Sequence, residues 1–271
     1  MYYPCNVRNA VEISDIYSLS TQHFAKDYCF YGESHDFWET VFVLDGKVGI
    51  TADNDVYTLG SGQMVFHKPM EFHRIRSEDG TDPTVVIFSF SAADMPKLQK
   101  RVYTVTDENL DEVKAIFEIM TKVFYRCDGR LFVNSDRELD ARLVLKRLEL
   151  LLLTVILSDE TEETREISRG AENYRRIVDT MRKNIGQMLS VDDIARLCNM
   201  SRSNVKRVFS KYSGMGVIEY FNAMKVKRAK KLLRDGMSIK EVATELGFDN
   251  QNYFSTMFKR IDGVSPGKYK E

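Results

Sequence analysis

Short apolar stretches broken by turn residues dominate the first third of the chain. Between residues 28 and 90, segments such as FWETVFVL, GQMVFH and TVVIFSF are separated by Gly, Asp and Asn, with turns expected at residues 45–46 and 53–55. Several short strands with frequent turn signals are typical of a small β-barrel or sandwich. We therefore expect an all-β region here.

After residue 96 the apolar positions recur at three- and four-residue steps, which indicates helices. The first helical stripe consists of Leu110, Val113, Ile116, Phe117, Met120 and Phe124. A second helix is expected to start near Ser135, with Glu138 completing a capping box, and to run to about Leu157. It holds more leucines than one narrow stripe can carry, so we expect it to be buried on more than one side. Its own β-region and a second copy of the chain are both candidates for that cover.

The last hundred residues contain one pattern twice: an amphipathic helix, a tight turn and a polar helix. The copies are VDDIARLCNMSRSNVKRVFSKYSG and SIKEVATELGFDNQNYFSTMFKRIDG. A small residue, a turn residue that accepts a left-handed backbone and an apolar anchor recur 48 positions apart, as Ala195, Asn199 and Val205 and then as Ala243, Gly247 and Tyr253. These residue types at these intervals predict a helix-turn-helix, and two copies predict DNA binding.

The second helix of each copy is expected to read DNA. Ser201 and Asp249 are the expected N-caps, and Tyr253 is expected to pack inward. The predicted DNA-binding residues of the first copy are Arg202, Ser203, Asn204, Lys206, Arg207 and Lys211, and those of the second are Asn250, Gln251, Asn252, Ser255, Thr256 and Lys259. Arginine suits guanine and asparagine suits adenine, whereas an outer lysine suits phosphate. For each residue, base contact, phosphate contact and plain solvent exposure remain open.

Charge supports the division of the chain into two parts. Residues 171–271 hold 20 Lys and Arg against 11 Asp and Glu, whereas residues 1–170 hold 19 against 29. The basic run at residues 217–236 is expected to be a connecting helix that contacts phosphate. A basic half joined to an acidic half indicates a nucleic-acid module with an acidic partner module.

Other features restrict the class of protein. The four cysteines are isolated, so we expect reduced thiols and neither a zinc knuckle nor a disulfide framework. The N-terminal residues do not read as a secretory leader, and the apolar run at residues 150–157 is too short to span a bilayer. These observations predict a soluble cytoplasmic protein.

The C-terminal half resembles the AraC/XylS family of bacterial transcription regulators. The resemblance rests on the two motifs, on AMKVKRAKKLL between them, and on Gly247-Phe248, Tyr253-Phe254, Phe258-Lys259, Gly263, Ser265-Pro266 and Tyr269. It implies seven helices, two of them DNA-reading, and activation by contact with RNA polymerase. Asn199 departs from the glycine that is common at that turn.

The N-terminal β-region resembles the cupin-like effector domain of many such regulators, through ESHDFWETVFVLDG and GSGQMVFHKPMEFHRI. In the metal-binding cupin pattern, His35, Glu39, Gly46 and His73 match, while Glu33 stands where the first histidine is usual. Since these barrels usually bind a small organic effector, we expect no cofactor, with a divalent metal at His35, Glu39 and His73 as the alternative, manganese or iron being favoured. The predicted effector-pocket residues are Glu33, His35, Trp38, Glu39 and His73. Phe37, Phe42, Tyr57 and Phe66 could add an aromatic wall.

Together these features predict an α+β chain of two domains. Residues 1–157 form a cupin-like effector-binding and dimerisation domain, residues 158–172 a linker, and residues 173–271 a DNA-binding domain. The predicted function is a sequence-specific, effector-responsive transcription regulator, acting as an activator and a homodimer on double-stranded promoter DNA, and not as an enzyme. Two alternatives remain open: a metal-dependent cupin enzyme with a DNA-binding tail, and a constitutive regulator whose barrel only dimerises.

Overall fold

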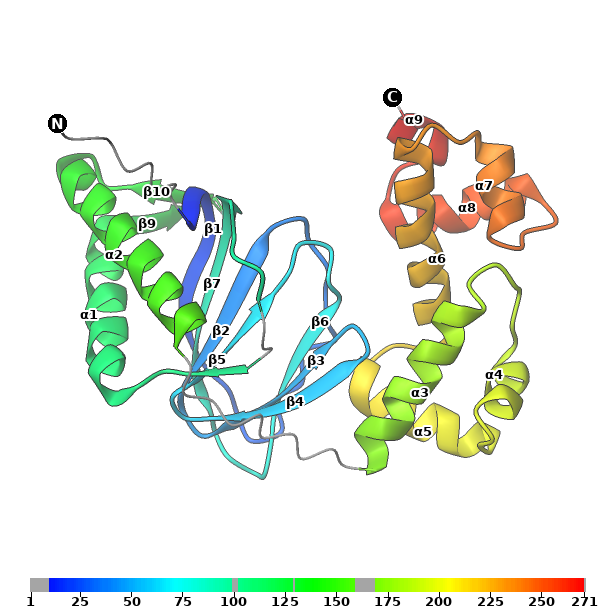
Figure 1. Cartoon of the computed structure of the whole chain (residues 1–271), viewed down its shortest axis with the longest axis horizontal. Coiled ribbons are helices and arrows are strands. Elements are labelled where there is room, and N and C mark those ends of the chain that lie inside the picture. The colour runs from blue at the N-terminus through cyan, green and yellow to red at the C-terminus, as the bar shows by residue number, and fades with distance from the viewer. Residues whose placement is uncertain (1–9, 99–101, 129, 159–168, 271) are drawn as a thin grey trace, which may run out of the picture. The chain divides into compact units, whose positions relative to one another are not determined.

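The computed structural model describes residues 10–98, 102–128, 130–158 and 169–270 (Figure 1). The chain divides into two compact units, one made mainly of residues 1–166 and the other mainly of residues 167–271. Strands and three helical segments make up the first unit, and the second is helical. The expected α+β organisation in two domains is therefore confirmed.

Two antiparallel sheets form the body of the first unit. The larger sheet has the order β1 (Glu12–His23), β7 (Thr84–Ala93), β2 (Trp38–Asp45), β5 (Gln63–His67) and β8 (Val102–Thr104). The smaller has the order β4 (Asp55–Gly60), β3 (Lys47–Ala52) and β6 (His73–Ser77). Within the described residues the two sheets are separate hydrogen-bonded units, so the expected β-region is a sandwich rather than a closed barrel.

The larger sheet is buried on both faces. Val41 and Val43 of β2 point into the core between the sheets, whereas Phe42 between them points to the opposite side. The inter-sheet core also holds Val48, Ile50, Leu59, Val65, Ile75 and Val85. Strand alternation therefore gives each central strand two apolar faces, and its sequence reads as a nearly continuous apolar run.

Helices α1 (Asp107–Val123) and α2 (Glu138–Leu157) cover the outer face of the larger sheet. Their buried residues pack against those of β1, β2, β5 and β7; they are Val113, Ile116, Met120, Val144, Leu148, Leu151, Leu152 and Val155. A hairpin of β9 (Phe124–Cys127) and β10 (Arg130–Val133) joins the two helices. Phe124 thus begins a strand instead of ending the helical stripe.

The start and the outer face of α2 differ from expectation. Residues Ser135–Arg137 form a 3-10 turn, and the N-cap is Arg137, which makes no side-chain capping bond, so the predicted Ser135–Glu138 capping box is wrong. Leu139, Leu143, Leu150 and Leu157 are exposed, on the side of the helix opposite the sheet. Within one chain, the helix is buried on one side only.

The second unit contains seven helices among its described residues, as the family resemblance implies. They are α3 (Arg169–Lys183), α4 (Val191–Leu197), α5 (Arg202–Ser213), α6 (Val217–Arg234), α7 (Ile239–Glu245), α8 (Gln251–Asp262) and α9 (Pro266–Lys270). Residues 169–172 of the expected linker form the first turn of α3, and residues 159–168 lie outside the described part of the chain. The predicted limits of the domains otherwise remain a prediction. Of the helices described in either unit, none combines the length and apolarity needed to cross a bilayer.

Candidate functional site

Helices α4 and α5 form the first helix-turn-helix. Ser190 caps α4 in a reciprocal capping box with Asp193, and the Ser201 hydroxyl accepts a hydrogen bond from the Asn204 N–H at the start of α5. Asn199 in the turn has a φ of 51°, a left-handed conformation that asparagine tolerates better than most residues. The expected cap Ser201 and the expected turn at Asn199 are confirmed.

Helices α7 and α8 form the second copy, with Ser238 as the cap of α7 and Gly247 in the turn at a φ of 75°. A Cβ at Gly247 would lie 2.3 Å from the Gly186 carbonyl oxygen, so only glycine fits. The N-cap of α8 is Asn250, whose side-chain oxygen accepts from the N–H groups of Asn252 and Tyr253. The prediction that Asp249 is the cap is therefore wrong, and the Asn250 oxygen is engaged within the protein.

A buried lysine of α6 fixes the second copy to the end of α3. The Lys225 ammonium donates to the carbonyl oxygens of Ile185 (2.7 Å), Gln187 (2.8 Å) and Leu246, and its side chain is fully buried. Burial lowers the pKa of Lys225 to about 8, so the group is still largely protonated at neutral pH. Its three protons thus satisfy three carbonyls that no helix or strand bond uses.

Most of the predicted DNA-binding residues lie on exposed surface. In α5, Arg202, Ser203, Lys206, Arg207 and Lys211 are exposed and Asn204 is half-buried. In α8 and at its cap, Asn250, Gln251, Asn252, Thr256 and Lys259 are exposed and Ser255 is half-buried. Two arginines have partners in the free protein, Arg202 with Asp192 (2.9 Å) and Arg207 with the Asn204 side chain (2.8 Å).

Two residues of α8, Tyr253 and Arg260, are exposed but were not among the predicted DNA-binding residues. Tyr253 was expected to pack inward but is 53% exposed, and the apolar anchor of the helix is the fully buried Phe254. The interval between the copies is 48 residues up to the turn but 49 after it, because the second turn is one residue longer: Phe209 and Gly214 correspond to Phe258 and Gly263. Counted this way, exposed Arg260 corresponds to Lys211. The two C-cap glycines were the signal that could have revealed the longer turn.

A cavity of about 310 Å³, lined by both polar and apolar side chains, lies between the sheets of the first unit. Three of the predicted pocket residues, Glu33, Glu39 and His73, line it, and its aromatic residues are Phe24, Tyr28 and Phe30. Its other polar lining comes from Ser18, Ser20, Gln22, His67 and Arg74.

The other aromatic residues expected at the cavity lie elsewhere. Trp38, Phe42 and Phe66 belong to the core under α1 and α2. Even-numbered residues of β2 face the helices and odd-numbered ones face the cavity, so the assignment of Trp38 to the pocket is wrong. Phe37 stacks on the ring of His35 at 3.8 Å between centroids, and Tyr57 packs in the inter-sheet core.

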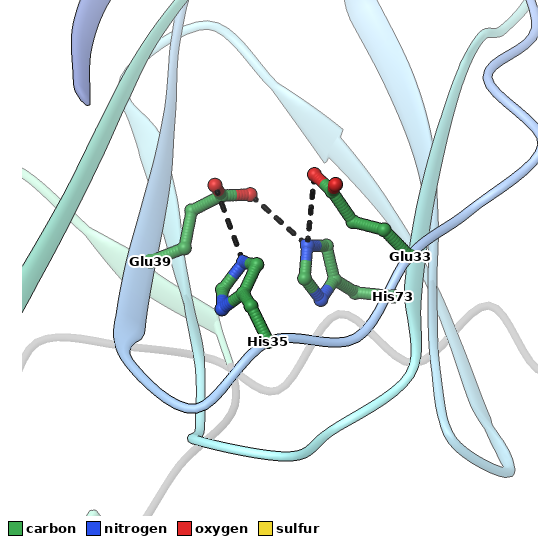
Figure 2. Close-up of side chains that lie close together, drawn as sticks. All are labelled: Glu33, His35, Glu39 and His73. Atoms are coloured by element: carbon green, nitrogen blue, oxygen red, sulfur yellow. Dashed lines mark ion pairs between the residues drawn. The ribbon is translucent and has the colours of Figure 1, made fainter. Parts of the chain in front are cut away.

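At one side of this cavity, Glu33, His35, Glu39 and His73 point toward one another (Figure 2). Glu39 of β2 lies 3.6 Å from the His35 Nε2 and 3.2 Å from the His73 Nε2, and the Glu33 carboxylate lies 3.9 Å from the same His73 atom. A β-bridge between residues 33 and 73 brings Glu33 into the group. The structure thus gathers four residues that the sequence placed in two distant segments.

Electrostatics keep the buried carboxylate ionised. Burial by itself would raise the pKa of Glu39, but His35 and His73 outweigh it and hold the pKa well below its usual range. For His73, burial lowers the pKa and the neighbouring Glu39 carboxylate raises it. The net result is that the pKa of His73 is raised. Burial lowers the pKa of His67, which stacks on His73 at 4.3 Å. Ser89 donates a hydrogen bond of 2.8 Å to Glu39.

Comparison with known proteins matches both units to described families. Residues 18–124 match the AraC-like ligand binding domain, and residues 194–271 match a helix-turn-helix domain. The Msm operon regulatory protein of Streptococcus mutans is 27% identical over 98% of this chain and 97% of its own length. The transcriptional activator RhaR of Pectobacterium carotovorum is 24% identical over 88% of this chain and 84% of its own, and the uncharacterized regulator YfiF of Bacillus subtilis is 24% identical over 87% and 77%.

Two helix-turn-helix motifs joined to a ligand-binding sandwich define a DNA-binding transcription regulator with an effector domain. The chain belongs to the AraC family of such regulators.

Proposed function

We propose that this regulator activates transcription by binding two successive major-groove segments of one promoter site through α5 and α8, under control of a small molecule bound in the cavity. The observation that carries the proposal is the presence of two complete helix-turn-helix motifs in one compact unit, joined by α6 and by the bonds of Lys225. Successive major grooves on one face of a duplex are about 34 Å apart, so two reading helices need a fixed separation. We propose that the protein acts on the chromosome, in the cytoplasm.

The cavity is the proposed effector site. Every residue that lines it falls within residues 18–124, the segment that matches the ligand-binding domain. Serine and glutamine side chains on β1, together with the carboxylates and imidazoles opposite, favour a small polar molecule over an apolar one. We propose regulation rather than catalysis as the role of this ligand.

The names of the relatives support the proposed direction of regulation. The RhaR proteins to which this chain is similar are named transcriptional activators. We extend that role to this chain, together with contact to RNA polymerase, which the family resemblance implies.

The exposed face of α2 supports a homodimer. Leu143, Leu150 and Leu157 are spaced seven residues apart, with exposed fractions of 60%, 65% and 67%. A seven-residue apolar repeat on the face opposite the sheet is the pattern of a two-helix seam, and the same helix of a second copy provides a matching repeat. We propose that α2 pairs with α2 of another chain.

The proposed dimer is tested by sedimentation. Leu143→Glu combined with Leu150→Glu should give a monomer, while Leu131→Glu on the β10 hairpin should leave a dimer. A double variant that remains dimeric would contradict the pairing of α2 with α2.

The DNA-binding proposal is tested with Lys206→Ala combined with Arg207→Ala. On duplexes selected by the wild-type protein from a random-sequence library, affinity should fall at least about 10-fold, and the slope of log K against log salt should decrease by about 0.9 for each lost phosphate contact. The matched control is Lys122→Ala in the last turn of α1, which removes an exposed lysine from the other unit. Unchanged affinity and salt slope in the double variant would show that α5 does not contact DNA.

A further inference from the structure

The two histidines of the four-residue group are oriented as metal ligands are. The His35 Nδ1 lies 3.0 Å from the Phe37 carbonyl oxygen, and the His73 Nδ1 lies 3.1 Å from the Glu71 carbonyl oxygen. A carbonyl only accepts, so Nδ1 carries a proton in both rings and, in the neutral ring, Nε2 carries the lone pair. Metal-binding histidines are commonly held in this way, by a backbone carbonyl at the nitrogen that does not bind the metal.

Both Nε2 atoms face the group and lack a hydrogen-bonded partner. Each is buried, and neither forms a hydrogen bond with a described residue, although Glu39 lies within ion-pair distance of both. Burying a polar atom without a partner is costly. His73 is only 4% exposed, so solvent does not readily meet that need. A cation bound by these atoms would meet it.

The spacing of the four donors suits one ion. One donor atom from each of Glu33, His35, Glu39 and His73 lies within 4.8 Å of every other. Metal bonds to imidazole nitrogen and carboxylate oxygen are about 2.0–2.2 Å, so two ligands of one ion are at most about 4.4 Å apart. Side-chain movements of a few tenths of an ångström would close the set, and Glu33, whose side chain is 53% exposed, is free of the packing that would resist such a movement.

The ligand set and the adjoining cavity indicate which kind of small molecule a metal ion at this site could bind. Two imidazoles and two carboxylates offer mixed nitrogen and oxygen ligation, and an octahedral ion would keep two further positions. Glu33, Glu39 and His73 also line the cavity, as do the hydroxyl groups of Ser18 and Ser20. Open positions would therefore face the space in which the effector is proposed to bind.

We propose that Glu33, His35, Glu39 and His73 bind a divalent first-row transition metal, and that the effector is a small molecule that chelates this metal through two adjacent oxygen atoms. The metal part of the inference stands without the proposed function, whereas the effector part rests on the cavity being the effector site. The competing arrangement is a metal-free ion pair between His73 and Glu39.

The test uses the full chain, stripped with EDTA and freed of the chelator, and titrated calorimetrically with Mn²⁺, Zn²⁺ and, under anaerobic conditions, Fe²⁺. The wild type should bind one ion per chain, and that ion should raise its melting temperature. His35→Gln should weaken binding at least about 100-fold and abolish the thermal shift. Glu33→Gln, at an exposed position where folding is not at risk, should weaken binding about 10-fold or more.

The matched control is His23→Gln, since His23 lies exposed at the end of β1, bonded to Thr84 and outside the group. It should bind the ion as the wild type does. If the wild type bound none of the three ions, or if His35→Gln bound them as tightly as the wild type, the metal site would be overturned and the ion pair favoured. DNA affinity of His35→Gln, measured in parallel, should be unchanged, so loss of the metal site is distinguishable from failure of the DNA-binding proposal.

Open coordination positions are tested on the Mn²⁺-loaded chain. Bound Mn²⁺ with exchangeable waters accelerates the relaxation of solvent protons, and oxalate, a two-oxygen chelator, should reverse that acceleration without removing the ion. Persistence of the acceleration at saturating oxalate, or its absence from the start, would overturn the chelation half of the proposal.

Discussion

The two helix-turn-helix motifs follow one template, but their turns are built under different constraints. In the first copy, Asn199 occupies the left-handed position, whereas in the second Gly247 does so, with the Gly186 backbone against its α-carbon. The second turn is also one residue longer. The second copy thus depends on a close backbone contact at Gly247 and on the bonds of Lys225, neither of which has a counterpart described in the first copy. The difference teaches that equivalent positions in a repeat need not tolerate the same substitutions.

The largest expected effect is that of Gly247→Ala. A side chain there adopts an unfavourable φ and meets the Gly186 carbonyl, so the free energy of unfolding should fall by about 3 kcal/mol. Asn199→Gly at the equivalent turn should change it by less than about 1 kcal/mol. Urea denaturation followed by circular dichroism measures both. Equal losses in the two variants would show that the turns are equivalent.

Lys225→Met should have the next largest effect and lower the free energy of unfolding by about 2–3 kcal/mol. It leaves the carbonyls of Ile185, Gln187 and Leu246 buried without their donor. Lys231→Met, on the exposed face of the same helix, is the control and should be nearly neutral. Hydrogen exchange should further show faster opening of α7 and α8 than of α4 and α5 in the Lys225 variant. Uniform loss of protection would mean that Lys225 does not act on the second copy in particular.

The reading helices should differ in binding energy. Arg207 of α5 and Thr256 of α8 occupy equivalent, exposed positions. Arg207→Ala should weaken the free energy of binding to the selected DNA site by about 1–3 kcal/mol, and that to random DNA by less. Thr256→Ala should weaken binding to the selected site by under about 1 kcal/mol. Competition binding with both duplexes measures the difference. A larger loss for Thr256→Ala than for Arg207→Ala would show that α8 contributes more base-specific binding energy than α5.

The smallest expected effect concerns the cap of α8. Asn250→Ala removes the oxygen that accepts from two backbone N–H groups, so it should lower the free energy of unfolding by about 1 kcal/mol. Asp249→Ala, one residue earlier, should have little effect. Chemical denaturation of the pair decides between them, and the opposite ranking would restore Asp249 as the cap.

Local patterns predicted most of the helical unit. A serine cap and a turn residue each act over a few neighbouring positions, so the roles of Ser201 and Asn199 were predicted correctly. The extra residue in the second turn could not be seen from the residues up to the turn. It displaced the predictions for Asp249 and Tyr253 by one position.

The β-unit was less predictable because its strands face two environments. Trp38 looks like a pocket residue from composition, but the phase of β2 turns it toward the helices. Strand β1 was not expected, since Ser18, Ser20 and Gln22 face the cavity and interrupt the apolar alternation that marks a strand. Glu33 joins the histidines through a bridge between distant segments, which no local pattern specifies.

The larger sheet, buried on both faces, has a mechanical consequence. Along β5, His67 contributes to the cavity while its neighbour Phe66 packs beneath α1 and α2. A strand is too stiff to displace one of these residues without the other. Any ligand that shifts β5 or β2 by a fraction of an ångström therefore also moves the side chains on which α2, the helix with the exposed leucines, packs. A ligand bound in the cavity as proposed would act on one face of this sheet, and α1 and α2 pack on the other.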